Sequence, residues 1–150
     1  IDNGAAKNYI DRYFQRFAGV KRYMEETVEF ARKNHFVETV FGRRLYLPEI
    51  NGGNGPRKKG AERQAINAPM QGTAADLIKL SMNKVQGVLE AQKPAIKMIM
   101  QVHDELVFEL PAEEETWLRR EIPLLMAGVA ELKVPLLAEV GVGPNWDKAH

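Results

Sequence analysis

Three consecutive polar residues interrupt an apolar stretch near the end of the chain. His103, Asp104 and Glu105 separate two short β-prone runs, 98–102 and 106–108, and this pattern predicts a tight hairpin with its turn at His103 and Asp104. Two-residue turns favour Asn-Gly or Asp-Gly because they need positive φ angles, so the absence of glycine here indicates a site that needs particular side chains. Because carboxylate oxygens are the ligands that Mg²⁺ prefers, Asp104 and Glu105 are candidate metal ligands. An aspartate can also have a purely structural role in a turn, where its side chain accepts hydrogen bonds from nearby backbone N–H groups. The pattern alone leaves both interpretations open.

A second set of polar residues recurs every four positions in a long helix predicted over residues 61–91. Arg63, Asn67 and Gln71 drift by only about 40° per step around a helix, so they form one polar ridge. Arginine only donates hydrogen bonds, whereas asparagine and glutamine both donate and accept. These groups suit the base edges of a nucleic acid, but a polar helix face can equally be solvated surface.

Composition limits the class of protein. The 150 residues are 45% hydrophobic and include no cysteine, so the chain can bury a sizeable core, and disulfides and thiolate metal sites are excluded. The sequence holds no apolar run of the length of a membrane helix, and its first residues have no secretory pattern. These features predict a cytoplasmic protein with no membrane partner.

The net charge of +1 hides an asymmetry along the chain. Residues 1–100 carry 17 Lys and Arg against 10 Asp and Glu, whereas residues 101–150 carry 4 against 10. The positive charge is densest in a basic cluster, which consists of Arg43, Arg44, Arg57, Lys58, Lys59 and Arg63. Such a cluster can neutralise phosphates and give salt-sensitive DNA binding, or it can be part of a solvated loop.

Periodicity and turn residues predict a mixed order of elements. Helical spacing covers about 5–34 with an interruption at Ala18-Gly19, strands 36–40 and 43–47 flank a turn at Phe41-Gly42, and 51–56 is a loop. The long helix over 61–91 contains Pro69, which predicts a kink or an early start. The hairpin at 98–108 is followed by a helix over 112–132 and a final strand over 136–140.

Four segments of the chain resemble bacterial members of DNA polymerase family A, in that family's order. They are RRLYLP at 43–48, ERQAINAPMQGTAAD at 62–76, QVHDELVFE at 101–109, and PLLAEVG at 135–141 followed by NWD at 145–147. The third segment is similar to the family's motif C. Together the segments extend over most of the chain, which makes the resemblance highly specific.

The resemblance implies an α+β fold. An antiparallel palm-type sheet with the motif C hairpin would be packed by long helices, with N-terminal helices and a small hairpin from the fingers. Residues 1–60 would then be the C-terminal part of the fingers and residues 61–150 the C-terminal part of the palm.

The resemblance also implies the roles of the candidate residues in template-directed nucleotidyl transfer, in DNA replication and repair. Asp104 would be a ligand in a two-metal Mg²⁺ site and Glu105 its weaker partner, while His103 would orient the primer end. The ridge of Arg63, Asn67 and Gln71 would contact primer-template DNA in the minor groove, where acceptors are present at every base pair. Deoxynucleoside triphosphates would be the second substrate.

The motifs present do not make a complete polymerase. The family's other metal-bridging carboxylate and its triphosphate-binding fingers helix have no counterpart here, since the segment around Asp2 does not resemble that motif. We therefore expect a C-terminal fragment that is inactive alone. Two alternatives are a Mg²⁺-dependent nuclease or phosphohydrolase, which needs further acids such as Asp76 and Glu109 close to Asp104, and a non-catalytic DNA-binding module.

Overall fold

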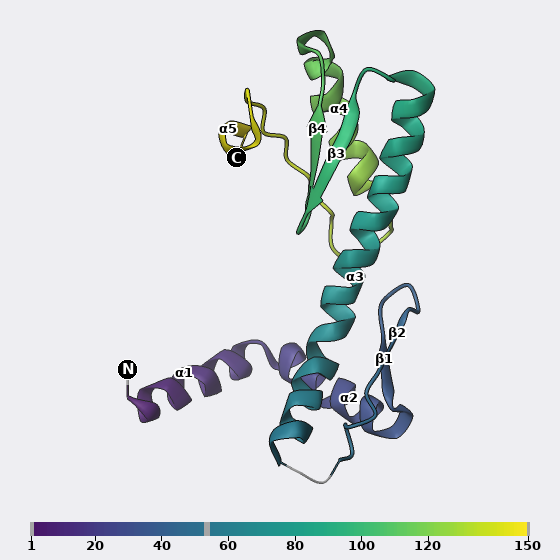
Figure 1. The fold of residues 1–150 in the computed structure, drawn as a ribbon. Coiled ribbons are helices and arrows are strands. Elements are labelled where there is room, and N and C mark those ends of the chain that lie inside the picture. Colours follow the sequence, from purple (N-terminus) through teal and green to yellow (C-terminus); the bar gives the residue numbers. More distant parts are fainter. Residues whose placement is uncertain (1, 53–54, 150) are drawn as a thin grey trace. The chain divides into compact units, whose positions relative to one another are not determined.

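The chain folds as two compact units that divide between Thr73 and Ala74 (Figure 1). The structure, a computed structural model, describes residues 2–52 and 55–149. Each unit has its own hydrophobic core and its own two-stranded antiparallel sheet. The expected α+β class is therefore confirmed, while the expected boundary between fingers and palm at residue 60 stays a prediction.

The first unit begins with two helices, α1 (Asn3–Arg16) and α2 (Ala18–Asn34). The Asp2 side chain caps α1 by accepting the Ala5 N–H at 2.7 Å, which satisfies one of the N–H groups that a helix start leaves unpaired. The expected interruption is confirmed, but it falls at Phe17, whose φ of −117° and ψ of 57° leave the helical region. Ala18 and Gly19 already belong to α2.

Strands β1 (Phe36–Glu38) and β2 (Arg44–Tyr46) form the expected small hairpin. They pair in antiparallel register, with Val37 opposite Leu45. Gly42 has a φ of +80° in the connecting turn, a conformation that glycine adopts without steric cost. Both strands are shorter than expected.

The core of the first unit lies between α2, the hairpin and the start of α3. It contains Ala31, Val37, Leu47, Ile50, Ala61 and Ala65.

Helix α3 (Gly55–Gln92) begins six residues earlier than the sequence predicts. Gly55 and Pro56, which we expected in a loop, form its first turn, where proline fits because its missing N–H would have had no helical partner. Asn51 and Gly52 of that expected loop remain outside the helix, and its other residues, Gly53 and Asn54, lie outside the described residues. Pro69 lies within α3 and does not end it.

The second unit packs its sheet against helices. Strands β3 (Lys97–Val102) and β4 (Glu105–Glu109) form the predicted second hairpin, followed by η1 (Ala112–Glu114), α4 (Glu115–Ala127) and the short α5 (Trp146–Ala149). Figure 1 shows β3 and β4 beside α4. The core joins the end of α3 to α4 through Val85, Leu89, Ile96, Leu118 and Ile122.

Two sequence predictions in this unit are wrong. The helix expected over 112–132 ends at Ala127, because Gly128 follows and its carbonyl accepts the Lys84 ammonium at 3.0 Å rather than a helical N–H. The strand expected over 136–140 does not form. Each sheet of the described residues has only two strands, β1 with β2 and β3 with β4. This segment is instead held by a side chain, because Arg119 donates to the Val140 carbonyl at 3.1 Å and Val140 packs on the core.

None of the helices in the described part of the chain combines the length and the apolar character that crossing a membrane requires.

Candidate active site and nucleic-acid interface

The β3–β4 hairpin places its acidic residues at one tip. Val102 pairs with Glu105, so His103 and Asp104 alone form the turn, as the sequence predicts. The register shifts between Met98 and Met100, which leaves Ile99 as an extra residue. Without that bulge, the pairing of Met98 with Phe108 would continue to Val102 with Asp104, and a single residue would have to reverse the chain. The bulge therefore makes the two-residue turn possible.

His103 adopts a left-handed backbone conformation, with a φ of +53°. This conformation costs a residue with a Cβ about 1–2 kcal/mol, and only glycine avoids the cost. The Gln101 side chain supports the turn, since its Nε2 donates to the His103 carbonyl at 2.6 Å. Sequence reasoning missed this role of Gln101, although a polar residue two positions before His103 was a usable signal.

The two acids at the tip differ in their surroundings. Asp104 is exposed, whereas Glu105 is half-buried. Trp146 Nε1 lies 3.4 Å from Glu105 Oε2 and donates to it, so α5 helps to orient the Glu105 carboxylate. The role of Trp146 was also missed, because a contact between residues 41 positions apart leaves no periodic signal in the sequence.

The tip offers part of a metal site. Carboxylate oxygens of Asp104 and Glu105 fit Mg²⁺ chemically, but the described residues contain no group of three or more His, Cys, Asp or Glu side chains that could hold an ion. The nuclease alternative requires such a convergence, with Asp76 or Glu109 as the nearest candidates in sequence. The described residues give that alternative no support.

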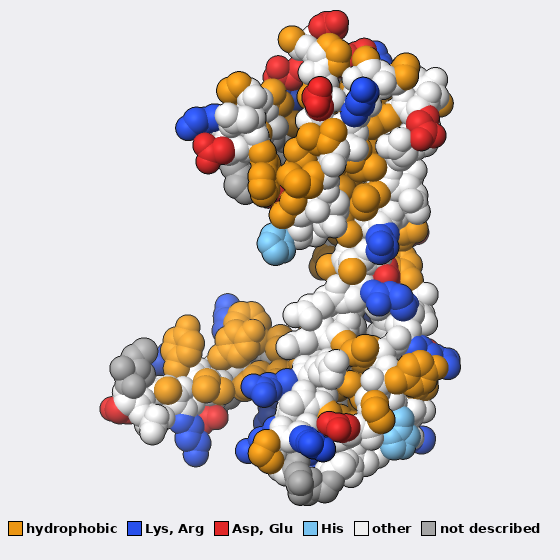
Figure 2. Space-filling model, in the orientation of Figure 1, with side chains coloured by type: hydrophobic (Ala, Val, Ile, Leu, Met, Phe, Trp, Pro, Cys, Tyr) orange, Lys and Arg blue, Asp and Glu red, His pale blue; other side chains and the backbone are white. Residues whose placement is uncertain are grey.

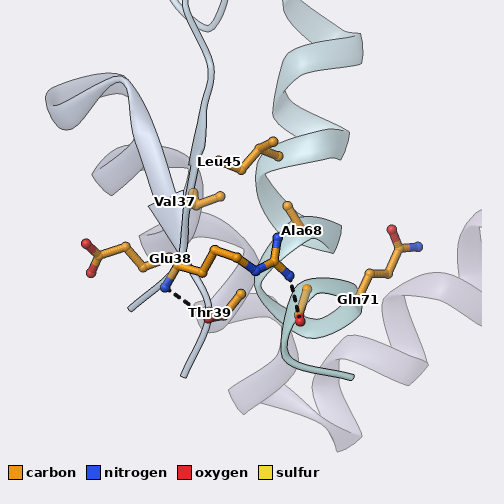
Figure 3. A pocket seen from close by; sticks show the side chains of 8 residues that line it. Val37, Glu38, Thr39, Leu45, Ala68 and Gln71 are labelled. Atoms are coloured by element: carbon orange, nitrogen blue, oxygen red, sulfur yellow. Dashed lines mark hydrogen bonds between the residues drawn. The ribbon is translucent and has the colours of Figure 1, made fainter. Parts of the chain in front are cut away.

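The predicted ridge lies in the first unit, on α3. Arg63, Asn67 and Gln71 are all exposed, and their spacing of four within one continuous helix places them along one side. In Figure 3 the Gln71 side chain points away from the neighbouring Thr39. The structure therefore leaves all three side chains accessible to a partner.

The basic cluster is partly neutralised by nearby acids. Arg44 Nε donates to Glu38 Oε1 at 2.7 Å, and this hydrogen bond raises the pKa of Arg44 above its ordinary value. Arg57 lies 3.9 Å from Glu49, and both pairs are exposed, so they contribute little to stability. Sequence reasoning missed Glu38 as an opposing charge, since the β1–β2 register that places it opposite Arg44 is a tertiary feature.

Positive side chains nevertheless remain plentiful on the first unit. Figure 2 shows more Lys and Arg than Asp and Glu on the visible face of this unit. Lys58, Lys59 and Arg63 are exposed, and among the residues that the structure describes they take part in no ion pair. They are the members of the cluster best placed to meet a phosphate backbone.

A sequence model of DNA polymerase family A matches residues 1–148. The chain belongs to DNA polymerase family A. Among similar family members, DNA polymerase I of Pseudomonas aeruginosa is 52% identical over 150 residues, which are 100% of this chain and 16% of that protein. DNA polymerase I of Streptococcus pneumoniae is 44% identical over 149 residues, covering 99% of this chain and 17% of that protein.

A solved structure of the family has the same fold. The POL domain of Pol1 from M. smegmatis, in complex with DNA primer-template and dNTP, matches with a TM-score of 0.96 at 41% identity. The match covers 99% of this chain and 26% of that one. The chain thus spans about one sixth of the length of the family A relatives that it matches.

The left-handed turn of the hairpin predicts the effect of His103→Gly. Glycine removes a strain of about 1–2 kcal/mol but costs about 0.5–1 kcal/mol in chain entropy on folding, so we expect the hairpin to gain up to about 1.5 kcal/mol. Slower amide hydrogen exchange in β3 and β4 would report this gain. His103→Ala keeps the strain and is the matched control, and faster exchange in His103→Gly would contradict the account.

Proposed function

We propose that this chain is the C-terminal fingers and palm portion of a bacterial DNA-directed DNA polymerase. The observation that carries the proposal is the β3–β4 tip, where a two-residue turn presents Asp104 and Glu105 within a chain that belongs to family A from residue 1 to residue 148. Because the chain spans 16–17% of its relatives, the activity is that of a longer protein. Its substrates are primer-template DNA and deoxynucleoside triphosphates, and its compartment is the bacterial cytoplasm.

Asp104 and Glu105 take different parts in this proposal. The exposed Asp104 carboxylate is free to approach a divalent ion and the primer terminus, and it is the primary metal ligand. Glu105 is half-buried and accepts a hydrogen bond from Trp146, so it acts from an outer position or through water. Mg²⁺, when bound, supplies charge stabilisation to the attacking and leaving oxygens of nucleotidyl transfer.

The remaining ligands come from outside this chain. A two-metal site needs another carboxylate to bridge the ions, and no third acid, His or Cys joins Asp104 and Glu105 among the described residues. We propose that the rest of the longer polymerase supplies it, together with the helix that binds the triphosphate. By this reasoning the chain alone does not catalyse incorporation.

Arg63, Asn67 and Gln71 contact the minor groove of the primer-template duplex. Purine N3 and pyrimidine O2 accept hydrogen bonds at both A·T and G·C pairs, so donors placed there detect the shape of a correct pair without distinguishing its sequence. A template-copying enzyme needs this property. His103 at the hairpin tip orients the primer end.

Substitution of the two acids tests their ranking. In the full-length polymerase, Asp104→Asn should lower kcat by orders of magnitude while DNA affinity stays nearly unchanged, because a metal ligand is lost and no DNA contact is removed. Glu105→Gln should cost less. The exposed Asp147 on α5 supplies the control, Asp147→Asn. Equal losses for Asp104→Asn and Glu105→Gln would show that the ranking is wrong.

Truncation of the ridge tests the minor-groove contact. Each of Arg63→Ala, Asn67→Ala and Gln71→Ala should raise the activation free energy of primer extension by about 1–3 kcal/mol, because a hydrogen-bonding partner on the DNA is left unpaired. Arg63→Ala should be the most severe and should reduce the salt dependence of DNA binding, while the other two should mainly alter extension from mismatched primer ends.

Gln15→Ala is the control for the ridge. Gln15 is an exposed glutamine of the first unit that lies on α1 rather than on α3. Primer extension and DNA binding at several salt concentrations measure all four variants. If the three ridge variants extend matched and mismatched primers as wild type does, the ridge is solvated surface.

A further inference from the structure

The turn between β1 and β2 is hydrogen-bonded to α3 at the segment weakened by Pro69. Proline has no N–H, so the Ala65 carbonyl loses its helical hydrogen bond. Four residues later, Thr73 Oγ1 donates to the Pro69 carbonyl at 2.6 Å and accepts the Val40 N–H at 3.0 Å. One hydroxyl therefore ties the hairpin turn to the helix.

A second contact lies one residue earlier on the helix. Arg43 Nη2 donates to the Gly72 carbonyl at 3.0 Å (Figure 3). A Cβ at Gly72 would lie 2.7 Å from Thr39 Cγ2 and 3.3 Å from Arg43 Nη2, so only glycine allows the turn to approach this closely. Thr39 is itself fixed, since its Oγ1 accepts the backbone N–H groups of Phe41 and Arg43.

The contacts from the turn meet α3 directly after Gln71, at Gly72 and Thr73. Thr73 Oγ1 in turn donates to the carbonyl of Pro69, two residues before Gln71. Among the described residues the Gln71 amide has no hydrogen bond of its own, so the backbone of α3 sets where it points. An open hollow of about 250 Å³ is lined by Ala68, Gln71 and Gly72 of α3 and, from the hairpin, by Val37, Thr39 and Arg43.

We propose that the residues 39–43, here called the brace, position Gln71 for its contact with DNA, with Thr73 and Arg43 as positioning residues. The inference rests on the proposed function, because it gives Gln71 a partner in the minor groove. Pro69 leaves the helix one hydrogen bond short just before Gln71, and the brace restores the lost rigidity through Thr73 and Gly72. None of these brace residues has to touch the DNA.

Removal of one hydroxyl tests the inference in the full-length polymerase. Thr73→Val keeps the shape of the side chain but loses both hydrogen bonds, and it should lower the ratio of matched to mismatched primer extension by about three- to tenfold. Thr73→Ser keeps the hydroxyl and should restore the wild-type ratio. Thr116→Val, on the exposed surface of α4, is the matched control.

A double variant separates positioning from a merely structural role. If Thr73 acts through Gln71, the ratio of matched to mismatched primer extension should be no lower in Gln71→Ala/Thr73→Val than in Gln71→Ala alone. Amide hydrogen exchange at Val40 should also accelerate in Thr73→Val, which confirms that the hydrogen bond was lost. Gly72→Ala, which pushes the brace away from α3, should reproduce the change in the ratio.

The outcomes that overturn the inference are distinct from those that overturn the proposed function. If Gln71→Ala changes the ratio but Thr73→Val does not, or if the two effects add fully, the brace does not position Gln71 while the ridge assignment stands. If Gln71→Ala itself has no effect, the ridge assignment fails and this inference fails with it.

Discussion

The register of the β3–β4 ladder decides which side chains reach the tip of the hairpin. The extra residue at Ile99 moves the pairing by one position, so that Val102 faces Glu105 and the turn keeps two residues. A slip of one residue along a strand would move each side chain to the other face of the sheet. The position of both acids therefore depends on one bulge and on the core beneath it, where Met98 and Phe108 pack against α3 and α4.

The left-handed His103 and the partly restrained Glu105 are consequences of that register. A turn of two residues requires positive φ, and His103 accepts it at some cost in stability. Gln101 and Trp146 then hold the turn carbonyl and the Glu105 carboxylate. In the first unit the same relation recurs, because the β1–β2 turn supports a helix that carries Pro69. In both units a side-chain hydrogen bond reaches the carbonyl of the locally unfavourable residue, from Gln101 to His103 and from Thr73 to Pro69.

Local pattern predicted the parts of the fold that local physics controls. The hairpin tip at His103 and Asp104 and the break between the first two helices follow from periodicity and turn chemistry, and the structure confirms both. The strand expected over 136–140 failed because β-propensity does not reveal whether a hydrogen-bonded neighbour exists. The roles of Gln101, Trp146 and Glu38 were not predicted, because each depends on the register of a hairpin or on a contact distant in sequence.

The affinity of the full-length polymerase for Mn²⁺ tests most directly whether the hairpin tip holds the metal. With primer-template bound, titration followed by electron paramagnetic resonance should give a Kd at least about tenfold higher for Asp104→Asn than for wild type. Glu109→Gln alters an acid on the same strand at the opposite end from the tip, and its Kd should not change. An unchanged Mn²⁺ affinity in Asp104→Asn, or an equal loss in Glu109→Gln, would contradict the metal site at the tip.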